Sequence, residues 1–409
     1  MRKTLLVTND YPPRPGGIQS YLYRFVQELP AEDIAVYCST WHPARCAEFD
    51  AAQPYRIIRN PTKVLLPTLR VRREVASIIR QGDYETVWFG AAAPLALMSH
   101  YLRRHTNVQR IVASTHGHEV GWAMLPCTHA ALRIIGNGCD VITYVSHYTQ
   151  HRIGRALGSH PQLQWLPSGV DTARFHPDKG GRQRIRQRHH IASDTPVIVC
   201  ISRLVPRKGQ DTLIKALPRV LRDIPDALLV IVGGGPSAKR LHTLAHRYGV
   251  SDHVLFTHLV PDDDLPLYYA AADVFAMPCR TRGQGLDVEG LGIVFLEASA
   301  TGIPVIAGNS GGAPETVDNG VTGVVVDGRD SNAVATELLR FLSSERRRTS
   351  FGSNGREWML SQWQWSTLGQ KLSHVLNGAD SDAAGDDPLL RRMTYPRTQR
   401  LCEEHPHYD

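Results

Sequence analysis

The sequence predicts an α/β protein made of two doubly wound, Rossmann-like domains that face each other across a cleft. Along the N-terminal half, short β-branched runs alternate with longer amphipathic runs, as in parallel sheets covered by helices. The same alternation restarts after a polar, basic stretch at 178–190. A chain of 409 residues, with 42% hydrophobic and 21% charged residues, is long enough for two such domains.

The expected strands are short and apolar, and the expected helices have one apolar face. In the N-terminal half the strands are Thr4–Thr8, Ile34–Cys38, Thr86–Phe89, Ile111–Ser114 and Val141–Val145, and the helices are Gly17–Leu29, Leu69–Arg80, Pro94–Arg103 and Ser146–Leu157. In the C-terminal half the strands are Val197–Ile201, Leu228–Val232, Val254–Phe256, Val274–Met277 and Val305–Ala307, and the helices include Asp211–Leu221, Ser237–Tyr248 and Trp358–Leu376.

These elements predict the division of the chain. Residues 1–170 form the first Rossmann-like domain, 171–190 a linker region, 191–360 the second Rossmann-like domain, and 361–378 a C-terminal helix. Residues 379–409 are rich in Asp, Pro and Arg and have no apolar period, so we expect a disordered tail. Ligands of open α/β sheets bind at the carboxyl ends of the strands, so two such domains would share a site between them.

The positive charge is confined to the first half of the chain. Residues 1–167 hold 18 Lys and Arg against 11 Asp and Glu, whereas the remainder holds 28 of each. This indicates an anionic surface or acceptor that faces the N-terminal domain. No helix-turn-helix, zinc-finger or RNA-binding motif accompanies the charge, so nucleic acid is not an expected partner.

Cysteine usage and hydropathy bound the location. The seven cysteines include no CxxC pair, which favours a reducing cytoplasm. No run of about 18 apolar residues predicts a transmembrane helix. The apolar stretch near the N-terminus spans only a few residues before Asn9, so it reads as a first buried strand rather than an export signal.

The most informative segment is Arg280–Gly302. Glu289 and Glu297 lie eight positions apart, and Gly290–Gly292 separates Glu289 from the apolar run Ile293–Leu296, which should begin a helix. A helix N-terminus offers free N–H groups to phosphate, and glycines allow close approach. The two glutamates could accept hydrogen bonds from the hydroxyls of a hexose and a ribose. Alternatively, either glutamate could be a solvated helix residue.

Two further loops follow expected strands. The backbone N–H groups of Gly16 and Gly17, after the first strand, could meet a diphosphate, although the loop could be an ordinary Pro/Gly turn. Arg203 and Lys208 follow the first strand of the second domain, where two cations could clamp a diphosphate and stabilise its charge as it leaves. The alternative is a solvated basic turn, with Arg207 as its more solvated member.

The histidine-rich stretch 114–119 also follows a strand. One histidine could stand against a transferred sugar, could serve a metal site that lacks a clear third ligand, or could have a structural hydrogen-bonding role. The acidic triplet Asp262–Asp264 resembles a Mg²⁺ or Mn²⁺ site. It follows Pro261 and precedes an apolar segment, which favours a helix cap instead.

Taken together, these residues resemble the GT-B retaining glycosyltransferases of family four over about residues 3–377. The resemblance rests on the Gly16–Gly17 loop, His118, Leu166–Asp171, Arg203 with Lys208, and Glu289 with Glu297. Within that family, Arg280–Gly302 and Tyr11–Gly17 are similar to actinobacterial phosphatidylinositol mannosyltransferases. The implied reaction moves mannose from GDP-mannose to a phosphatidylinositol mannoside, with an α-1,6 linkage to inositol.

The resemblance assigns roles to individual residues, and it implies neither a metal nor another cofactor. Arg203 and Lys208 match the pair that grips the donor diphosphate, Glu289 matches the carboxylate on the donor hexose, and Glu297 matches the carboxylate on the ribose. His118 matches the histidine near the reactive face of the sugar. The remaining matches are the backbone groups of Gly290, Leu291, Gly292 and Ile293 around sugar and phosphate, and of Val260 at the base.

The lipid acceptor implied by the resemblance would be held by the N-terminal domain at a membrane surface. Two segments combine apolar and basic residues and could seat on anionic lipid, one with Arg70, Arg72 and Arg73 and one with Arg103 and Arg104. Each could equally be an amphipathic helix with a solvated basic face. The expected location is the cytoplasm, peripheral on the inner face of the plasma membrane.

Other functions fit parts of the sequence. A soluble family-four transferase would use another nucleotide-sugar and acceptor, and the basic N-terminal domain would then be incidental. A nucleotide-sugar epimerase of the same architecture would need acid and base residues that the sequence does not identify. A nucleotide-sugar-binding protein without catalytic activity would keep its function after loss of Glu289 or Lys208.

Overall fold

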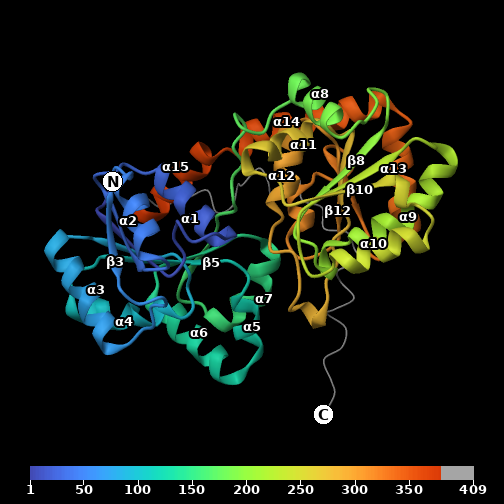
Figure 1. Ribbon diagram of the computed structural model, residues 1–409. Coiled ribbons are helices and arrows are strands. Elements are labelled where there is room, and N and C mark those ends of the chain that lie inside the picture. The colour runs from blue at the N-terminus through green and yellow to red at the C-terminus, as the bar shows by residue number, and fades with distance from the viewer. Residues whose placement is uncertain (379–409) are drawn as a thin grey trace, which may run out of the picture.

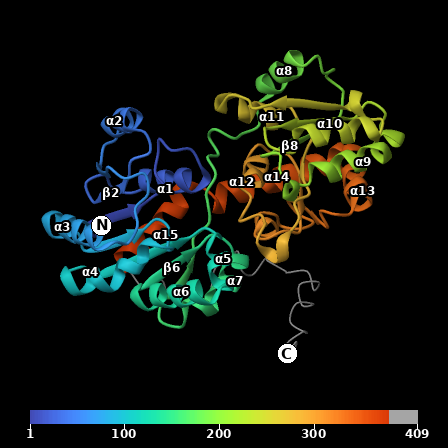
Figure 2. The ribbon, with the colours of Figure 1, turned by 60° about the horizontal axis from the view of Figure 1, so that its bottom comes forward.

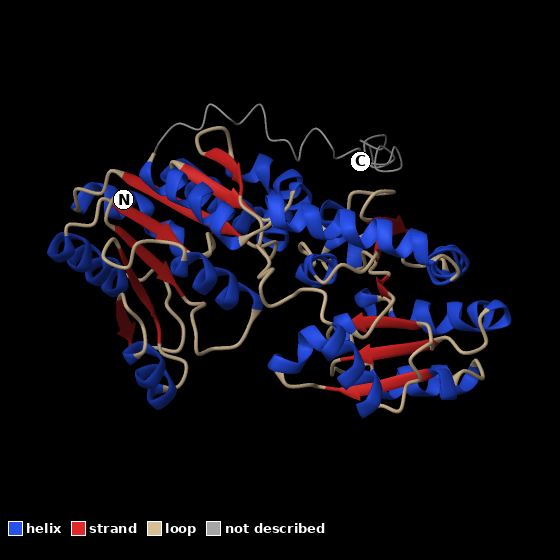
Figure 3. Ribbon diagram, turned by 90° about the horizontal axis from the view of Figure 1, so that it is seen from above, coloured by secondary structure: helices blue, strands red, loops and turns tan. Residues whose placement is uncertain are grey.

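The computed structural model describes residues 1–378, and the predicted tail at 379–409 lies outside the described residues. Each half of the chain forms one sheet with helices on both faces, and the two bodies lie side by side (Figure 1, Figure 3). Every strand pairing within the two sheets is parallel. The predicted pair of doubly wound α/β domains is therefore confirmed.

The N-terminal sheet has seven strands in the order β3-β2-β1-β4-β5-β6-β7. They are β1 (Thr4–Thr8), β2 (Ile34–Ser39), β3 (Arg56–Asn60), β4 (Thr86–Phe89), β5 (Arg110–Thr115), β6 (Val141–Tyr144) and β7 (Gln162–Trp165). The five predicted strands are confirmed within a residue or two. The sequence analysis missed β3 and β7, which lie at the two edges of the sheet and are only partly buried.

The C-terminal sheet has six strands in the order β10-β9-β8-β11-β12-β13. They are β8 (Val197–Ile201), β9 (Leu228–Val232), β10 (Val254–His258), β11 (Val274–Met277), β12 (Val305–Gly308) and β13 (Gly323–Val326). All five predicted strands are present, and the missed strand, β13, again lies at an edge. The fully buried β8 and β11 show why the central strands read clearly as continuous apolar runs.

Helices cover both faces of each sheet (Figure 3). Those between the N-terminal strands are α1 (Gly17–Gln27), α2 (Pro43–Ala51), α3 (Leu69–Gly82), η1 (Leu95–Met98), α4 (Ser99–His105), α5 (Glu119–Met124), α6 (Pro126–Gly138) and α7 (His147–Leu157). Those of the C-terminal half include α8 (Lys179–Arg188), α9 (Gln210–Asp223), α10 (Ala238–Arg247), α11 (Leu265–Ala270), α12 (Ile293–Ala300), α13 (Ser331–Leu342), α14 (Glu345–Gln362) and α15 (Trp365–Asn377).

The helix predicted over Trp358–Leu376 is two helices, because the chain turns between α14 and α15. Trp363 is fully buried at the turn, and its carbonyl accepts the Val170 N–H at 2.8 Å. The chain then returns to the N-terminal domain, where α15 packs beside α1 (Figure 1, Figure 2). Arg110 donates to the Val375 carbonyl there, so the last described helix is part of the first domain's core.

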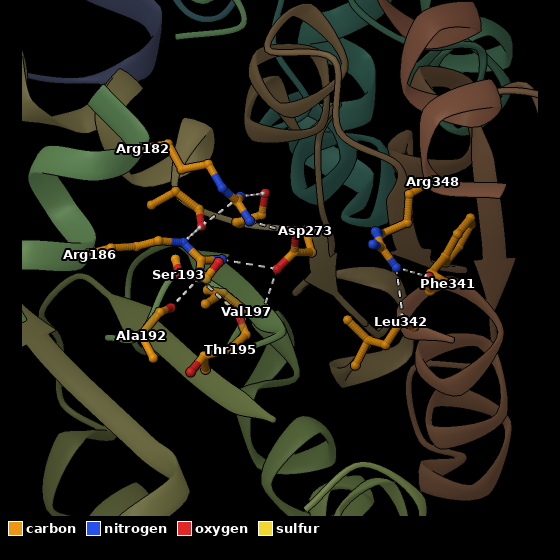
Figure 4. A network of polar contacts seen from close by, with 12 residues as sticks. Arg182, Arg186, Ala192, Ser193, Thr195, Val197, Asp273, Phe341, Leu342 and Arg348 are labelled. Carbon is orange, nitrogen blue, oxygen red and sulfur yellow. Dashed lines mark hydrogen bonds and ion pairs between the residues drawn. The ribbon is translucent and has the colours of Figure 1, made fainter. Parts of the chain in front are cut away.

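The stretch at 171–190, expected as a linker, contains helix α8. Arg186 is 4% exposed and, together with Arg182, forms an ion pair with Asp273, whose carboxylate also accepts the Val197 N–H (Figure 4). A buried guanidinium needs such partners because unpaired buried charge is costly. These contacts attach α8 to the start of β8, so the C-terminal domain begins before residue 190.

The helices were also compared with the length and hydropathy that a membrane-spanning helix requires. Among the helices of residues 1–378, none is both long enough and apolar enough to cross a bilayer.

Candidate functional site

The strongest polar contact in the predicted site joins Lys208 and Glu289. Lys208 Nζ lies 2.5 Å from Glu289 Oε2, and the two residues are 9% and 8% exposed. Lys208 comes from the turn after β8, and Glu289 comes from the loop before α12, so the fold joins residues 81 positions apart. Two charges this buried are tolerated because each satisfies the other. The structure thus brings together two of the four residues predicted to be catalytic.

A glycine turn leads from Glu289 into helix α12. Gly292 precedes the helix with φ 91° and ψ 65°, a left-handed conformation that favours glycine. A Cβ added to Gly292 would lie 2.6 Å from the Phe295 ring, so the position also lacks space for a side chain. The glycine itself thus adds no side chain at the N-terminus of α12, where N–H groups without helical partners could bind phosphate.

Glu297 lies one turn into α12 and is held by Tyr269. The Tyr269 hydroxyl donates to Glu297 Oε2 at 2.6 Å. Burial raises the pKa of Glu297 from 4.5 to about 6, although the Tyr269 hydrogen bond and nearby Arg174 lower it in part. Burial of the carboxylate disfavours its charged form, so Glu297 is not the solvated helix residue that the sequence analysis gave as an alternative. Glu289 thus lies just before the glycine turn, and Glu297 lies in the helix that follows that turn.

Arg203 differs from Lys208 in its exposure. The Arg203 side chain is exposed, and its backbone carbonyl accepts a hydrogen bond from Gln210. Among residues 1–378, its guanidinium has no hydrogen-bond or ion-pair partner. Arg207 forms an ion pair with Asp287 at 3.2 Å and is half-buried, so it is not the freely solvated residue that the sequence analysis expected. Arg203 is therefore the more available of the two arginines for an anionic ligand.

His118 lies in the loop between β5 and α5. Its side chain is 41% exposed, and Nε2 lies 3.3 Å from Oε1 of the fully buried Glu119. His116 has the structural role instead: its Nε2 lies 2.7 Å from the Gly90 carbonyl, its ring packs against Tyr21, and burial lowers its pKa. The residues alone did not specify which histidine would contact the ligand, and the family resemblance named His118. The exposure of His118 and the buried contacts of His116 agree with that assignment.

The loop that carries His118 also touches the C-terminal domain. A Cβ built on Gly290 would lie 3.7 Å from the His116 carbonyl oxygen. This close approach puts the histidine loop of the first domain next to the glycine turn of the second. Gly16 and Gly17 begin α1 and are exposed, and a side chain on Gly17 would meet no heavy atom within 4 Å. The space beside Gly17 is open, whereas a Cβ on Gly16 would lie 2.1 Å from Gln19 Oε1.

The acidic triplet and Val260 have simpler surroundings. Asp262–Asp264 forms a 3₁₀ turn before α11, but no side-chain hydrogen bond caps that helix. The predicted position at a helix N-terminus is therefore confirmed, although the side chains form ion pairs instead of a capping hydrogen bond: Asp262 pairs with Arg174 and Asp264 with Arg188, each at 2.7 Å. No group of three potential metal ligands occurs in residues 1–378. Val260 is half-buried against the C-terminal core.

The basic segments predicted to meet lipid are not equivalent. Arg70 and Arg73 are exposed at the start of α3, whereas Arg72 donates to the Pro67 carbonyl. Arg103 pairs with Asp140 at 2.6 Å and is committed to the fold, while Arg104 is exposed. Three large apolar side chains beside Arg70 are more than half exposed, namely Val64, Leu66 and Leu69. Residues 64–73, which lead into α3 and are called the α3 segment, therefore keep the mixed apolar and basic character predicted for them.

The sequence analysis missed Glu315 altogether. This residue lies in η6 (Ala313–Thr316) of the C-terminal domain and is 3% exposed, yet its carboxylate accepts hydrogen bonds from the first turn of α7 in the N-terminal domain. A local motif search finds no signal for it, because its partners are backbone groups more than 160 positions away.

Comparison with known proteins identifies the family and agrees with the fold. Residues 181–358 match the family model described as "Glycosyl transferases group 1", and residues 15–174 match the model described as "Glycosyltransferase Family 4". Among solved structures, that of Anabaena Alr3699/HepE in complex with UDP has a TM-score of 0.75 at 21% identity, over 92% of this chain and all of that one. Sucrose-phosphate synthase from Thermosynechococcus elongatus has a TM-score of 0.73 at 21% identity, over 92% and 99%.

Two curated relatives are much closer in sequence. The GDP-mannose-dependent alpha-(1-6)-phosphatidylinositol monomannoside mannosyltransferase of Mycolicibacterium smegmatis is 55% identical over 91% of this chain and 98% of that protein. The GDP-mannose-dependent monoacylated alpha-(1-6)-phosphatidylinositol monomannoside mannosyltransferase of Corynebacterium glutamicum is 49% identical over 92% and 98%. The chain therefore belongs to glycosyltransferase family four, the retaining glycosyltransferases of GT-B fold.

Proposed function

We propose that this protein transfers mannose from GDP-mannose to a phosphatidylinositol mannoside, forming an α-1,6 linkage to inositol with retention of configuration. The identity of 55% over nearly the whole length of a curated relative with that named activity carries the proposal. The buried Lys208–Glu289 pair at the mouth of a helix N-terminus supports it, since a nucleotide-sugar needs a cation for its phosphates and an acceptor for its hydroxyls.

In the proposed reaction the bond between the mannose C1 and the diphosphate oxygen breaks, and its electron pair leaves with GDP. Lys208, Arg203 and the N-terminus of α12 stabilise the charge that develops on the phosphate. The acceptor hydroxyl oxygen bonds to C1 on the face that GDP leaves. The departing phosphate oxygen takes the hydroxyl proton, so the step needs no protein nucleophile.

The other site residues hold the donor in this scheme. Glu289 accepts hydrogen bonds from mannose hydroxyls, and Glu297 accepts them from the ribose. The Tyr269 hydroxyl holds the Glu297 carboxylate in place. His118 stands against the reactive face of the sugar. Because Lys208 and Arg203 are proposed to neutralise the diphosphate, we propose that no metal is required. Turnover that survives a chelator would support this, and restoration only by added Mg²⁺ or Mn²⁺ would contradict it.

A donor and acceptor panel tests the proposed function. The purified protein would be incubated with GDP-mannose, GDP-glucose, UDP-glucose or UDP-galactose, together with lipid extracts that contain phosphatidylinositol monomannoside. We expect a dimannosylated lipid from GDP-mannose, identified by mass spectrometry and by α-mannosidase digestion. Transfer from the UDP-sugars alone, or to soluble sugars alone, would overturn the assignment.

The lipid acceptor requires contact with a membrane surface, and we propose that the α3 segment provides it on the cytoplasmic face. Exposed Arg70 and Arg73 stand beside exposed Leu66 and Leu69, a combination that suits anionic headgroups above an apolar layer. The α3 variant Arg70→Glu/Arg73→Glu should lose binding to anionic liposomes. The control Arg222→Glu/Arg247→Glu makes the same charge change on exposed positions of the C-terminal domain. Equal loss in both variants would refute a specific surface.

A further inference from the structure

We propose that Glu315 is a positioning residue that fixes the N-terminal domain against the donor-binding loop. This inference rests on the proposed glycosyl transfer, but on no particular sugar or acceptor. The Glu315 carboxylate accepts the His147 N–H at 2.8 Å and the Tyr148 N–H at 3.0 Å, and Nδ1 of His147 lies 3.1 Å from it. A carboxylate of one domain thus occupies the helix N-terminus of the other.

The contact of Glu315 with α7 is strong because it joins a buried carboxylate to the N-terminus of a helix. The first N–H groups of a helix have no partner within the helix, and they carry its partial positive charge. In α7, Ser146 Oγ accepts the Thr149 N–H, which leaves the N–H groups of His147 and Tyr148 to an outside acceptor. Glu315 is 3% exposed, so its charge is desolvated and depends on these bonds. Separating the domains would break all three.

The turn that carries Glu315 also holds the backbone of Glu289. The Gly312 N–H donates to the Glu289 carbonyl at 2.9 Å, and the Glu289 N–H donates to Ser310 Oγ at 3.4 Å. Gly311 has φ 56°, and a Cβ there would lie 1.9 Å from the Glu289 oxygen. The 310–315 turn is therefore packed directly on the residue proposed to bind the donor hexose.

The same turn touches α7 a second time. A Cβ on Gly312 would lie 2.6 Å from Ser146 Cβ and 2.3 Å from the Gly290 carbonyl oxygen. One short turn thus contacts the N-cap of α7 on one side and the glycine turn of the donor site on the other. A shift of the N-terminal domain at α7 would have to move this turn, and with it the alignment of an acceptor over the donor sugar.

The position of Glu315 predicts a separation of kinetic effects. Of the contacts predicted for GDP, only the Gly16–Gly17 backbone comes from the N-terminal domain. Arg203, Lys208 and Glu297 all belong to the C-terminal domain, so affinity for GDP should largely survive loss of the domain contact. Alignment of the acceptor from the other domain should not, and a small misplacement of reacting groups costs about 10- to 100-fold in rate. Glu315→Gln keeps the size of the side chain but presents an amide NH₂ to one of the helix N–H groups.

The first experiment measures kcat and donor Kd of Glu315→Gln with GDP-mannose. We expect kcat to fall about 10- to 100-fold while the Kd for GDP stays within about twofold. Glu345→Gln, an exposed glutamate at the start of α14, is the control for loss of one charge. A lower Tm with normal kcat would reduce Glu315 to a structural role. A parallel rise in donor Kd would place it in the donor pocket, and either result overturns the proposal.

A second variant changes the other side of the contact. His147→Pro deletes the N–H and the ring nitrogen that face Glu315, at the first position of α7, where proline is tolerated. Ser146 has φ −151° and ψ 150°, which suits a residue before proline. The effects of Glu315→Gln and His147→Pro on kcat should be far from additive in the double variant, because both break one contact. Additive effects would contradict the coupling.

Small-angle scattering separates this inference from the proposed function. With GDP bound, wild-type protein should be more compact than Glu315→Gln, whatever sugar or lipid the enzyme uses. If GDP-mannose transfer fails in the wild type but the scattering difference remains, the substrate assignment falls and the domain contact stands. If transfer succeeds and the scattering curves of the two proteins coincide, the role of Glu315 is refuted.

Discussion

The two domains present their site residues in opposite ways. In the C-terminal domain, Lys208 and Glu289 are 9% and 8% exposed and already paired at 2.5 Å. In the N-terminal domain, the His118 side chain is 41% exposed, and the space beside Gly17 is open. A donor with fixed shape and charge favours a preformed polar pocket, since preorganised groups need not rearrange during reaction. A large lipid acceptor favours an open face.

This contrast predicts that changes on the C-terminal side affect both stability and rate, whereas changes on the N-terminal side affect the rate with little effect on stability. The following experiments test that division, beginning with the largest expected effect.

Lys208→Met should reduce kcat by about 30- to 1,000-fold, equivalent to about 2–4 kcal/mol of lost transition-state stabilisation. It also leaves Glu289 as a buried, unpaired carboxylate, so the Tm should fall. The double variant Lys208→Met/Glu289→Gln should recover stability but not turnover. Steady-state kinetics and thermal melts measure the two effects separately.

Arg207→Met is the matched control for Lys208. It removes a neighbouring cation that pairs with half-exposed Asp287, and an exposed ion pair of this kind contributes little to stability. We expect near-normal turnover and Tm. Lys208→Met with near-normal kcat at saturating donor would defeat the role assigned to Lys208, and equal losses in the two variants would show a general effect of charge.

Gly292→Ala tests the glycine turn on the preformed side. Alanine at φ 91° and ψ 65° should cost about 1–3 kcal/mol of folding stability, and its Cβ would press on Phe295. Because the turn also presents the helix N–H groups, donor Kd should rise. Gly320→Ala is the control, because that exposed glycine has a similar φ of 88° but open space around it, so its Tm should fall without a change in donor Kd. A normal Tm and normal donor Kd for Gly292→Ala would contradict the preformed pocket.

His118→Asn should lower turnover about tenfold, within the range for a lost hydrogen-bonding group, and leave the Tm almost unchanged because the side chain is largely exposed. His116→Asn should instead lower the Tm and leave turnover nearly unchanged. It breaks the contact with the Gly90 carbonyl and the packing against Tyr21, so the Tm should fall. A stability loss at His118 would erase the contrast between the two domains.

The sequence predicted most of the fold because the buried strands are continuous apolar runs, as in Val197–Ile201. It missed β3, β7 and β13, whose edge positions leave them partly exposed and without that pattern. It also placed one helix across Trp363, since no local signal marks the return of the chain to the N-terminal domain. That return is fixed by tertiary packing of the tryptophan and by its bond to Val170.

The site was predictable where its residues share one segment or follow a strand, as for Glu289, Glu297 and Lys208. The direct pairing of Lys208 with Glu289 depends on how the loop after β8 meets the loop before α12. The spacing of residues along the sequence does not predict that contact. Glu315 escaped detection for the same reason in stronger form, because its partners are backbone N–H groups of another domain. Likewise, the ion pair of Arg103 with Asp140 removes a residue predicted to meet lipid.

Glu297→Gln gives the smallest expected effect and sharpens the comparison through pH. The pKa of Glu297 is raised from 4.5 to about 6, so the folded protein holds this proton more tightly than the unfolded chain does. The stabilising contribution of the protonated carboxyl is complete below pH 4.5 and is lost as the pH rises through 6. Wild-type protein and Glu297→Gln should therefore have similar Tm values below pH 4.5. Above pH 6 the ligand-free variant should be the more stable by about 1–2 kcal/mol, while its donor Kd rises. Thermal melts from pH 4 to 8 measure the difference, and a gap that does not change with pH would show that Glu297 carries no such penalty. Burial of the Glu297 carboxylate would then carry no free-energy penalty, and the C-terminal side of the site would differ from the His118 side only in how buried its residues are.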